Sequence, residues 1–133
     1  MKIITLFLLI TTAFIFTSCK KQSIPISDSI VGRWELSQDG GGWGPIIYHK
    51  PGNDTLAIFT ATTYSFYNRE KLVKSGTYVV KKDTSYLYNQ LMNRIIFDNN
   101  TDLTREFTDI QNNQLSFWLD AYDAGSTTYR RIR

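Results

Sequence analysis

The sequence is poor in cysteine and histidine. Cys19 is the only cysteine among the 133 residues, and His49 is the only histidine. One cysteine excludes an internal disulfide, and one histidine excludes a metal site built from several histidines. The sequence also lacks a Gly-x-Ser-x-Gly segment, the elbow that presents a nucleophilic serine in α/β-hydrolases. We therefore interpret His49 as a surface residue, and we expect no catalysis and no cofactor.

The chain also lacks an apolar run long enough to span a bilayer. Its longest run, Ile3–Phe16, has 14 residues, whereas a membrane-spanning helix needs about 20. Lys2 precedes this run, and the small residues Thr17 and Ser18 separate it from Cys19. A positive charge, a short apolar segment and small residues, in this order, are typical of a secretory signal peptide.

The segment that ends at Cys19 resembles the lipobox of bacterial lipoproteins, with Phe16 where that motif usually has leucine. The resemblance implies that residues 1–18 are a signal peptide that is removed, and that Cys19 carries acyl chains such as palmitate. Residues 19–28 would then be the lipidated cysteine and an extended tether. Lys20 stands where an aspartate would retain a lipoprotein in the inner membrane, so we expect an anchor in the outer membrane, on its periplasmic side.

Neither sign of charge dominates the composition. The sequence has 15 lysines and arginines against 12 aspartates and glutamates, which gives a formal net charge of +3. Basic residues do not form a stripe interleaved with aromatic residues, as they do at many nucleic-acid interfaces. We therefore expect no nucleic-acid partner, and the lipid is the only membrane contact that the sequence predicts.

The sequence is rich in short alternating segments. Aromatic and β-branched residues alternate with polar ones, and clusters of glycine, asparagine and aspartate separate the segments, as in half-buried strands joined by turns. We expect strands at residues 31–38, 46–48, 55–59, 63–67, 72–80, 94–98, 103–110, 115–119 and 127–132. Residues 86–93 fit either an irregular loop or one helical turn. The sequence thus predicts an all-β domain over residues 29–133, a small antiparallel up-and-down barrel of about eight strands.

Two segments of this domain resemble signatures of the lipocalin-like lipoproteins of Gram-negative bacteria. Gly32-Arg33-Trp34 is similar to the Gly-x-Trp signature of lipocalins. The run Thr63–Tyr78 resembles the second signature of the lipoprotein family. The resemblance implies a lipocalin-like barrel in which Gly32 and Trp34 have a structural role at the closed floor.

The same resemblance places a basic residue of the last strand over the ring of Trp34. Arg130 and Arg131 are adjacent in that strand and face opposite sides of the sheet. Arg131 is our candidate, and Arg130 remains open. A cation–π contact of this kind contributes about 0.5–2 kcal/mol.

The barrel and its aromatic residues together predict a binding protein. We expect the interior to bind a small apolar ligand, because aromatic side chains suit such a site. The candidate ligand contacts are Trp43, Tyr64, Phe66, Tyr78, Phe97 and Phe117. The alternative is an interaction module without a ligand cavity, in which loops that include Trp43 and Trp118 contact a protein or a glycan. Alternation along residues 115–119 predicts that Trp118 points outward.

Two groups of acidic residues mimic functional sites. Residues 98–109 have the acidic spacing of a calcium loop, but Leu103 replaces the glycine that permits its sharp turn. Asp120 and Asp123 could form the paired carboxylates of a glycosidase. We interpret both groups as turn residues and predict no metal site.

Overall fold

The computed structural model describes residues 25–101 and 104–133, so Cys19 and the predicted signal peptide lie outside the described residues. One short helix, α1 (Ile26–Ser29), precedes the strands. The described residues form nine strands: β1 (Gly32–Gly40), β2 (Ile46–Tyr48), β3 (Thr55–Phe59), β4 (Thr63–Asn68), β5 (Lys71–Thr84), β6 (Leu91–Phe97), β7 (Glu106–Gln111), β8 (Gln114–Leu119) and β9 (Ser126–Ile132).

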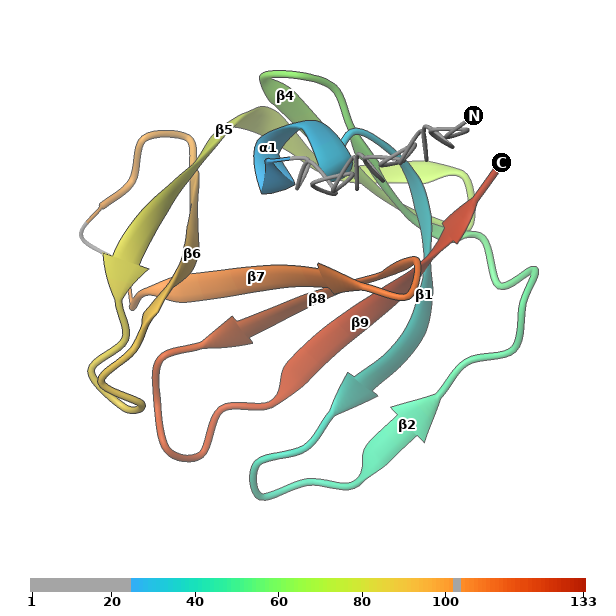
Figure 1. Ribbon diagram of the computed structural model, residues 1–133. Coiled ribbons are helices and arrows are strands. Elements are labelled where there is room, and N and C mark those ends of the chain that lie inside the picture. Colours follow the sequence, from blue (N-terminus) through green and yellow to red (C-terminus); the bar gives the residue numbers. More distant parts are fainter. Residues whose placement is uncertain (1–24, 102–103) are drawn as a thin grey trace, which may run out of the picture.

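All nine of these strands belong to one antiparallel sheet that closes into a ring (Figure 1). From β3 to β9 each strand pairs with the next, and β1 pairs with both β3 and β9. The closing register runs from Arg33↔Ile132 to Gly40↔Ser126. Closure gives hydrogen-bond partners to strand edges that an open sheet would expose. The all-β antiparallel prediction is confirmed, with nine strands where about eight were expected; β2 is a side strand on the end of β1.

The hairpin of β5 and β6 is longer than the sequence predicted. β5 continues to Thr84 instead of ending at residue 80, and β6 begins at Leu91 instead of residue 94. The two strands pair throughout this extension, as far as Thr84↔Leu91. Residues 86–93, which fit either a loop or one helical turn from the sequence, therefore divide between loop 85–90 and the start of β6.

The chain before β1 also differs from the expected extended tether. Residues 26–29 form the helical turn α1. Pro25 begins it with φ −54°, the value to which its ring confines the backbone. The Ser29 hydroxyl donates a hydrogen bond to the Ile26 carbonyl at 3.1 Å. α1 contacts β5 and β7 at one end of the ring (Figure 1).

Alternation turns one face of each strand into the ring, where the apolar side chains form a single buried cluster. Burial of such side chains is the main favourable term in folding. The buried members of the cluster are Ile30, Trp34, Leu36, Ala57, Phe59, Tyr64, Tyr78, Ile95, Leu115, Phe117 and Tyr129. The ring therefore has a packed centre.

Trp34, Gly32 and Arg131 lie together near α1. Trp34 is fully buried, and its indole N–H donates to the Ile30 carbonyl at 2.7 Å. Because Trp34 and Arg131 are directly paired across β1 and β9, they share a face, and the guanidinium carbon lies 4.0 Å from the indole centroid. Gly32 has φ +139°, and a Cβ there would lie 2.8 Å from Nη1 of Arg131. Arg130 faces the other side, where its Nε lies 3.3 Å from Glu35.

Candidate functional site

Five of the six predicted ligand contacts lie together inside the ring, but they pack against one another. The ring centroids of Tyr64 and Phe97 are 4.6 Å apart, and those of Tyr64 and Phe66 are 5.3 Å apart. Phe97 and Phe117 follow at 6.4 Å, and Tyr78 belongs to the same cluster. Separations of about 4.5–7 Å are those of aromatic pairs in direct contact. These five side chains therefore pack against one another as part of the core.

Trp43, the sixth predicted contact, lies elsewhere. Its side chain is 88% exposed, in the turn between β1 and β2, at the end of the ring away from α1 (Figure 1). Gly42 has φ +63° and approaches the Asp123 carbonyl so closely that no Cβ would fit. Glycine thus lets this turn pack against residues 123–125, while Trp43 itself extends into solvent and does not cover the interior.

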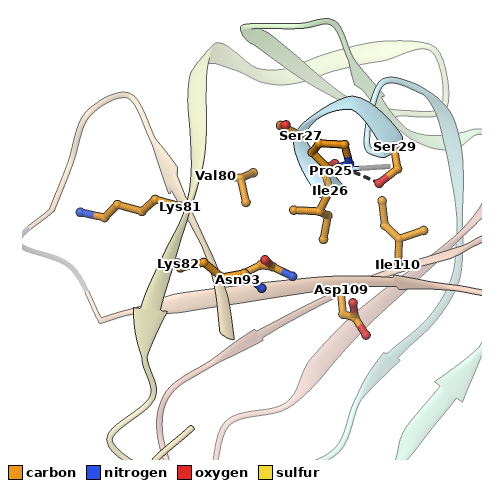
Figure 2. Close-up of a pocket in the computed structure, with 10 residues that line it drawn as sticks. All are labelled: Pro25, Ile26, Ser27, Ser29, Val80, Lys81, Lys82, Asn93, Asp109 and Ile110. Carbon is orange, nitrogen blue, oxygen red and sulfur yellow. Dashed lines mark hydrogen bonds between the residues drawn. The ribbon is translucent and has the colours of Figure 1, made fainter. Parts of the chain in front are cut away.

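A hollow of about 470 Å³ opens beside α1. Ile26 points from the helix toward the sheet, with Val80 of β5 and Ile110 of β7 on either side in this view (Figure 2). Val80 and Ile110 also pack against the core, so the apolar part of this hollow borders the filled interior. The rest of its lining is mostly polar: Pro25, Ser27, Ser29, Lys81, Lys82, Asn93 and Asp109.

Two further hollows meet on the outside of the ring, at β8. One has a volume of about 570 Å³ and the other about 320 Å³. Ser116 and Trp118 line both, so the two hollows are adjacent, and we call them together the Trp118 groove. The larger hollow extends toward loop 85–90 and the turn after β8, and the smaller one toward the β7–β8 turn at Asn112.

Trp118 has a fixed position in this groove. It alternates with the buried residues Leu115 and Phe117 and faces outward, as the sequence predicted. Its cross-strand neighbour on that face is Phe107 of β7, with the ring centroids 6.4 Å apart and the planes inclined by 27°. Phe107 is fully buried. The half-buried indole therefore packs against a fully buried ring, while part of the indole lines the groove.

Loop 85–90 forms one wall of the larger hollow, and hydrogen bonds to Asp120 fix the position of this loop. The Asp120 carboxylate accepts a hydrogen bond from the Ser85 hydroxyl at 2.6 Å and from the next two backbone N–H groups at 2.7 and 3.2 Å. Burial alone would raise the pKa of Asp120, but these three donors hold that pKa below its ordinary value. A carboxyl kept ionised in this way suits a structural role better than that of a general acid. The loop carries Tyr88 and Gln90 into the groove lining.

The groove is nearly free of charge. Among its lining residues the larger hollow has no acidic or basic side chain, and the smaller one has only Asp109. Amide and hydroxyl groups, which both donate and accept hydrogen bonds, supply most of the polar lining. These residues are Gln38, Gln90, Gln111, Asn112, Gln114, Ser116, Ser126 and Thr128.

The exposed aromatic side chains of the described residues gather at the end of the ring away from α1. They lie in the β1–β2 hairpin, in loop 85–90 and in the turn after β8 (Figure 1). Their exposed fractions range from 54% to 88%, and they are Trp43, Tyr48, Tyr86, Tyr88 and Tyr122. Tyr88 and Tyr122 also line the groove. This end of the molecule thus combines a hollow with unusually exposed aromatic surface.

The segment with calcium-like spacing holds strands together. Asp98 accepts hydrogen bonds from the Tyr64 hydroxyl at 2.8 Å and the Thr77 N–H at 3.0 Å, and the Lys74 ammonium lies 3.8 Å away. The bond from Tyr64 is the main reason why the pKa of Asp98 is lowered. In residues 25–101 and 104–133, no three His, Cys, Asp or Glu side chains are placed to hold a metal ion. Leu103 lies outside the described residues.

His49 lies beside an ion pair on the outside of β1. Glu35 contacts Arg130 there, and its Oε1 accepts from the Gly52 N–H at 2.8 Å. The His49 carbonyl accepts a hydrogen bond from Arg130, and the ring Nε2 lies 3.3 Å from Asp39. The His49 side chain is therefore half-buried at the surface of the molecule.

A comparison with known protein families finds no matching family model, and searches of curated proteins and of solved structures find no match. The likeness to lipocalin-like lipoproteins therefore remains a prediction from the residues of this chain. In the part of the chain that the structure describes, no helix has the length and apolar character that crossing a membrane requires.

Most of the groove was not predicted from the sequence. Alternation places Ser116, Trp118 and Thr128 on outward faces, and of these the sequence interpretation used only Trp118. The position of loop 85–90 depends on Asp120, which lies 35 residues beyond Ser85. Such a contact has no local signature in the sequence.

Proposed function

We propose that this chain is a lipid-anchored, non-enzymatic binding protein of the outer membrane, and that it binds its partner on the outside of a lipocalin-like barrel. The binding site is the Trp118 groove. The observation that carries the proposal is the meeting of two hollows at one fixed, partly exposed tryptophan. The mutual contacts of the interior aromatic rings also support an external site, because ligand and core side chains would compete for the same space.

The anchor in this proposal is Cys19, on the strength of the signal-like segment before it and of Lys20 after it. The position of α1 supports a groove that is accessible. α1 is at the opposite end of the ring from loop 85–90 and the turn after β8 (Figure 1). A tether that enters through Pro25 therefore leaves these loops pointing away from the bilayer, on the periplasmic side.

A second candidate is the small apolar ligand that the sequence suggested, bound at a different place. The hollow beside α1 favours it, because Ile26, Val80 and Ile110 give that hollow an apolar floor at the edge of the core. Its ligand would lie close to the tether and hence to the membrane surface.

Photocrosslinking in cells tests the external site. A benzophenone amino acid replaces Tyr122, whose side chain is 88% exposed at the rim of the groove. The matched control carries the same group at Val79, which is 49% exposed on β5 and lines none of the hollows described above. We expect a discrete product from position 122 that position 79 does not give.

The absence of a product specific to position 122 would overturn the groove as the binding site. The purified protein is also extracted with organic solvent. An apolar molecule recovered in equimolar amount, together with no product at position 122, would establish the second candidate instead.

A further inference from the structure

We infer that the ligand of the Trp118 groove is an uncharged saccharide chain. This inference rests on the proposed function, because it names the chemical class that the same groove binds. The lining combines neutral hydrogen-bonding side chains with aromatic faces, and it extends on both sides of Trp118. The neutral polar groups, the aromatic faces and the extent of the groove each restrict the chemical class of the ligand.

The charge of the lining excludes anionic ligands. A phosphate, a nucleotide or an acidic peptide needs cationic side chains or oriented N–H groups at its binding site, and the groove lining contains no lysine or arginine. Its one charged residue, Asp109, would repel an anion and can accept hydrogen bonds from hydroxyl groups. With one acidic side chain among mostly neutral amide and hydroxyl groups, the lining suits a neutral ligand that carries hydrogen-bond donors better than a charged one.

The polar groups match the hydroxyls of a sugar. Each sugar hydroxyl both donates and accepts, as do the amide and hydroxyl side chains of the lining. Some of these lining groups are held in place: the hydroxyls of Ser116 and Thr128 lie 3.0 Å apart, and the Ser37 hydroxyl donates to the Thr128 carbonyl at 2.8 Å. Groups fixed before binding lose less conformational entropy when a ligand arrives.

The aromatic groups match the apolar face of a pyranose. The face of an aromatic ring is electronegative and attracts the polarised C–H groups that a sugar ring presents on one side. Trp118 supplies such a platform against Phe107, and Tyr88 and Tyr122 border the larger hollow. An extended peptide fits less well, because β8 is already paired on both edges, with β7 and β9, and offers no free edge for strand addition.

The shape of the groove favours a chain of sugars over a single ring. The two hollows, of about 570 and 320 Å³, join at Ser116 and Trp118 on the outer face of β8. One sugar unit can stack on the indole while its neighbours contact the amides on either side. Affinity should therefore increase from a monosaccharide to a trisaccharide.

Titration of the purified full-length protein with defined sugars tests the inference. The probes are triacetylchitotriose, cellotriose and maltotriose, their monosaccharides, and the acidic trimer of galacturonic acid. Tryptophan fluorescence and calorimetry report binding. We expect at least one neutral trisaccharide to bind saturably and about tenfold more tightly than its monosaccharide, which corresponds to about 1.4 kcal/mol. The acidic trimer should bind more weakly than this neutral trisaccharide.

Substitutions inside and outside the groove test where the trisaccharide binds. Trp118→Ala should weaken binding of the trisaccharide about tenfold, which corresponds to about 1.4 kcal/mol. Because Trp118 also packs on Phe107, Tyr122→Ala provides a second variant at a side chain that is 88% exposed, and we expect it to weaken binding as well. Val79→Ser, outside the groove, is the matched control and should bind as the unaltered protein does.

Three results would overturn the inference: no binding of any neutral trisaccharide, tighter binding of the acidic trimer, or neutral binding that both groove variants leave unchanged. None of them affects the crosslink at position 122. A product there with a protein, together with no sugar binding, would keep the external site and reject the saccharide. Loss of the crosslink would reject the proposed function itself.

Discussion

Trp34 stabilises the end of the ring near α1. It is fully buried, it donates a hydrogen bond to Ile30, and Arg131 covers its ring. Trp34→Ala removes these contacts and leaves a cavity, so we expect the free energy of unfolding to fall by about 3–5 kcal/mol. Urea titration followed by circular dichroism measures it. Trp34→Phe keeps a ring and should lose less; equal stability of the two variants would contradict this account.

The inward-facing position of Glu106 disfavours the charged form of its carboxyl group. Glu106 is paired with Ile95 and Leu119 across its two neighbouring strands and shares their inward face. Burial raises the pKa of Glu106, and Lys74 offsets part of this rise. The folded protein therefore holds this proton more tightly than the unfolded chain does. The contribution of Glu106 to stability is therefore fully present below its ordinary pKa of 4.5 and is lost as the pH rises through the higher pKa of the folded state.

Glu106→Gln should consequently stabilise the protein at about pH 7 and give no such gain below about pH 4, where both states of the unaltered glutamate are protonated. Unfolding in urea at the two pH values measures the difference. The same gain at both pH values would show that packing, and not ionisation, is responsible.

Single residues also show what the sequence could not decide. Alternation identified the inward faces of Tyr64 and Phe117, but alternation gives the side of a sheet and not the distance across the ring. Whether those rings line a cavity or fill a core therefore required the structure. The choice between Arg130 and Arg131 likewise required the register of β1 with β9, which pairs Trp34 near the start of the domain with Arg131 near its end.

At the scale of elements, loop 85–90 depends on one carboxylate. Asp120→Ala removes three hydrogen-bond acceptor contacts from the loop. We expect the amides of Tyr86 and Leu87 to exchange with deuterium about tenfold faster, because hydrogen bonds to charged groups contribute about 1.5–3 kcal/mol, while the strands keep their protection.

Hydrogen exchange followed by mass spectrometry or NMR measures the effect of Asp120→Ala. Asp123→Ala, which removes a neighbouring carboxylate, is the control and should leave the loop amides unchanged. Faster exchange throughout the sheet would instead mean that Asp120 stabilises the whole ring.

The positions of the strands were mostly predictable, and their ends less so. Residues 46–48 and 55–59 were predicted with the bounds observed, because turn residues flank both segments. β5 exceeded its prediction because β6 supplies partners up to Leu91. The turn α1 was missed because four residues are too few for a helical period. Contacts between distant segments determine such features, and local patterns do not contain them.

At the scale of the whole molecule, we expect the proposed lipid anchor at Cys19 to be separable from the fold. Cys19→Ala should leave the far-ultraviolet circular dichroism spectrum unchanged and release the protein from the membrane, because acyl chains contribute about 0.8 kcal/mol for each buried methylene group. Cell fractionation with immunoblotting measures the release. Cys19→Ala protein that stays in the membrane fraction after a high-salt wash would refute the lipobox interpretation.

The pairing of β1 with β9 also determines the order in which the molecule can assemble. β1 is synthesised early, yet its partner residues, Ser126–Ile132, are made after all the other strands described. Contacts over such long stretches of chain form slowly, because a large loop must close first. Two groove residues, Ser126 and Thr128, arrive with β9. If the Trp118 groove is the binding site that we propose, a nascent chain lacks part of that site until the first and last strands have paired.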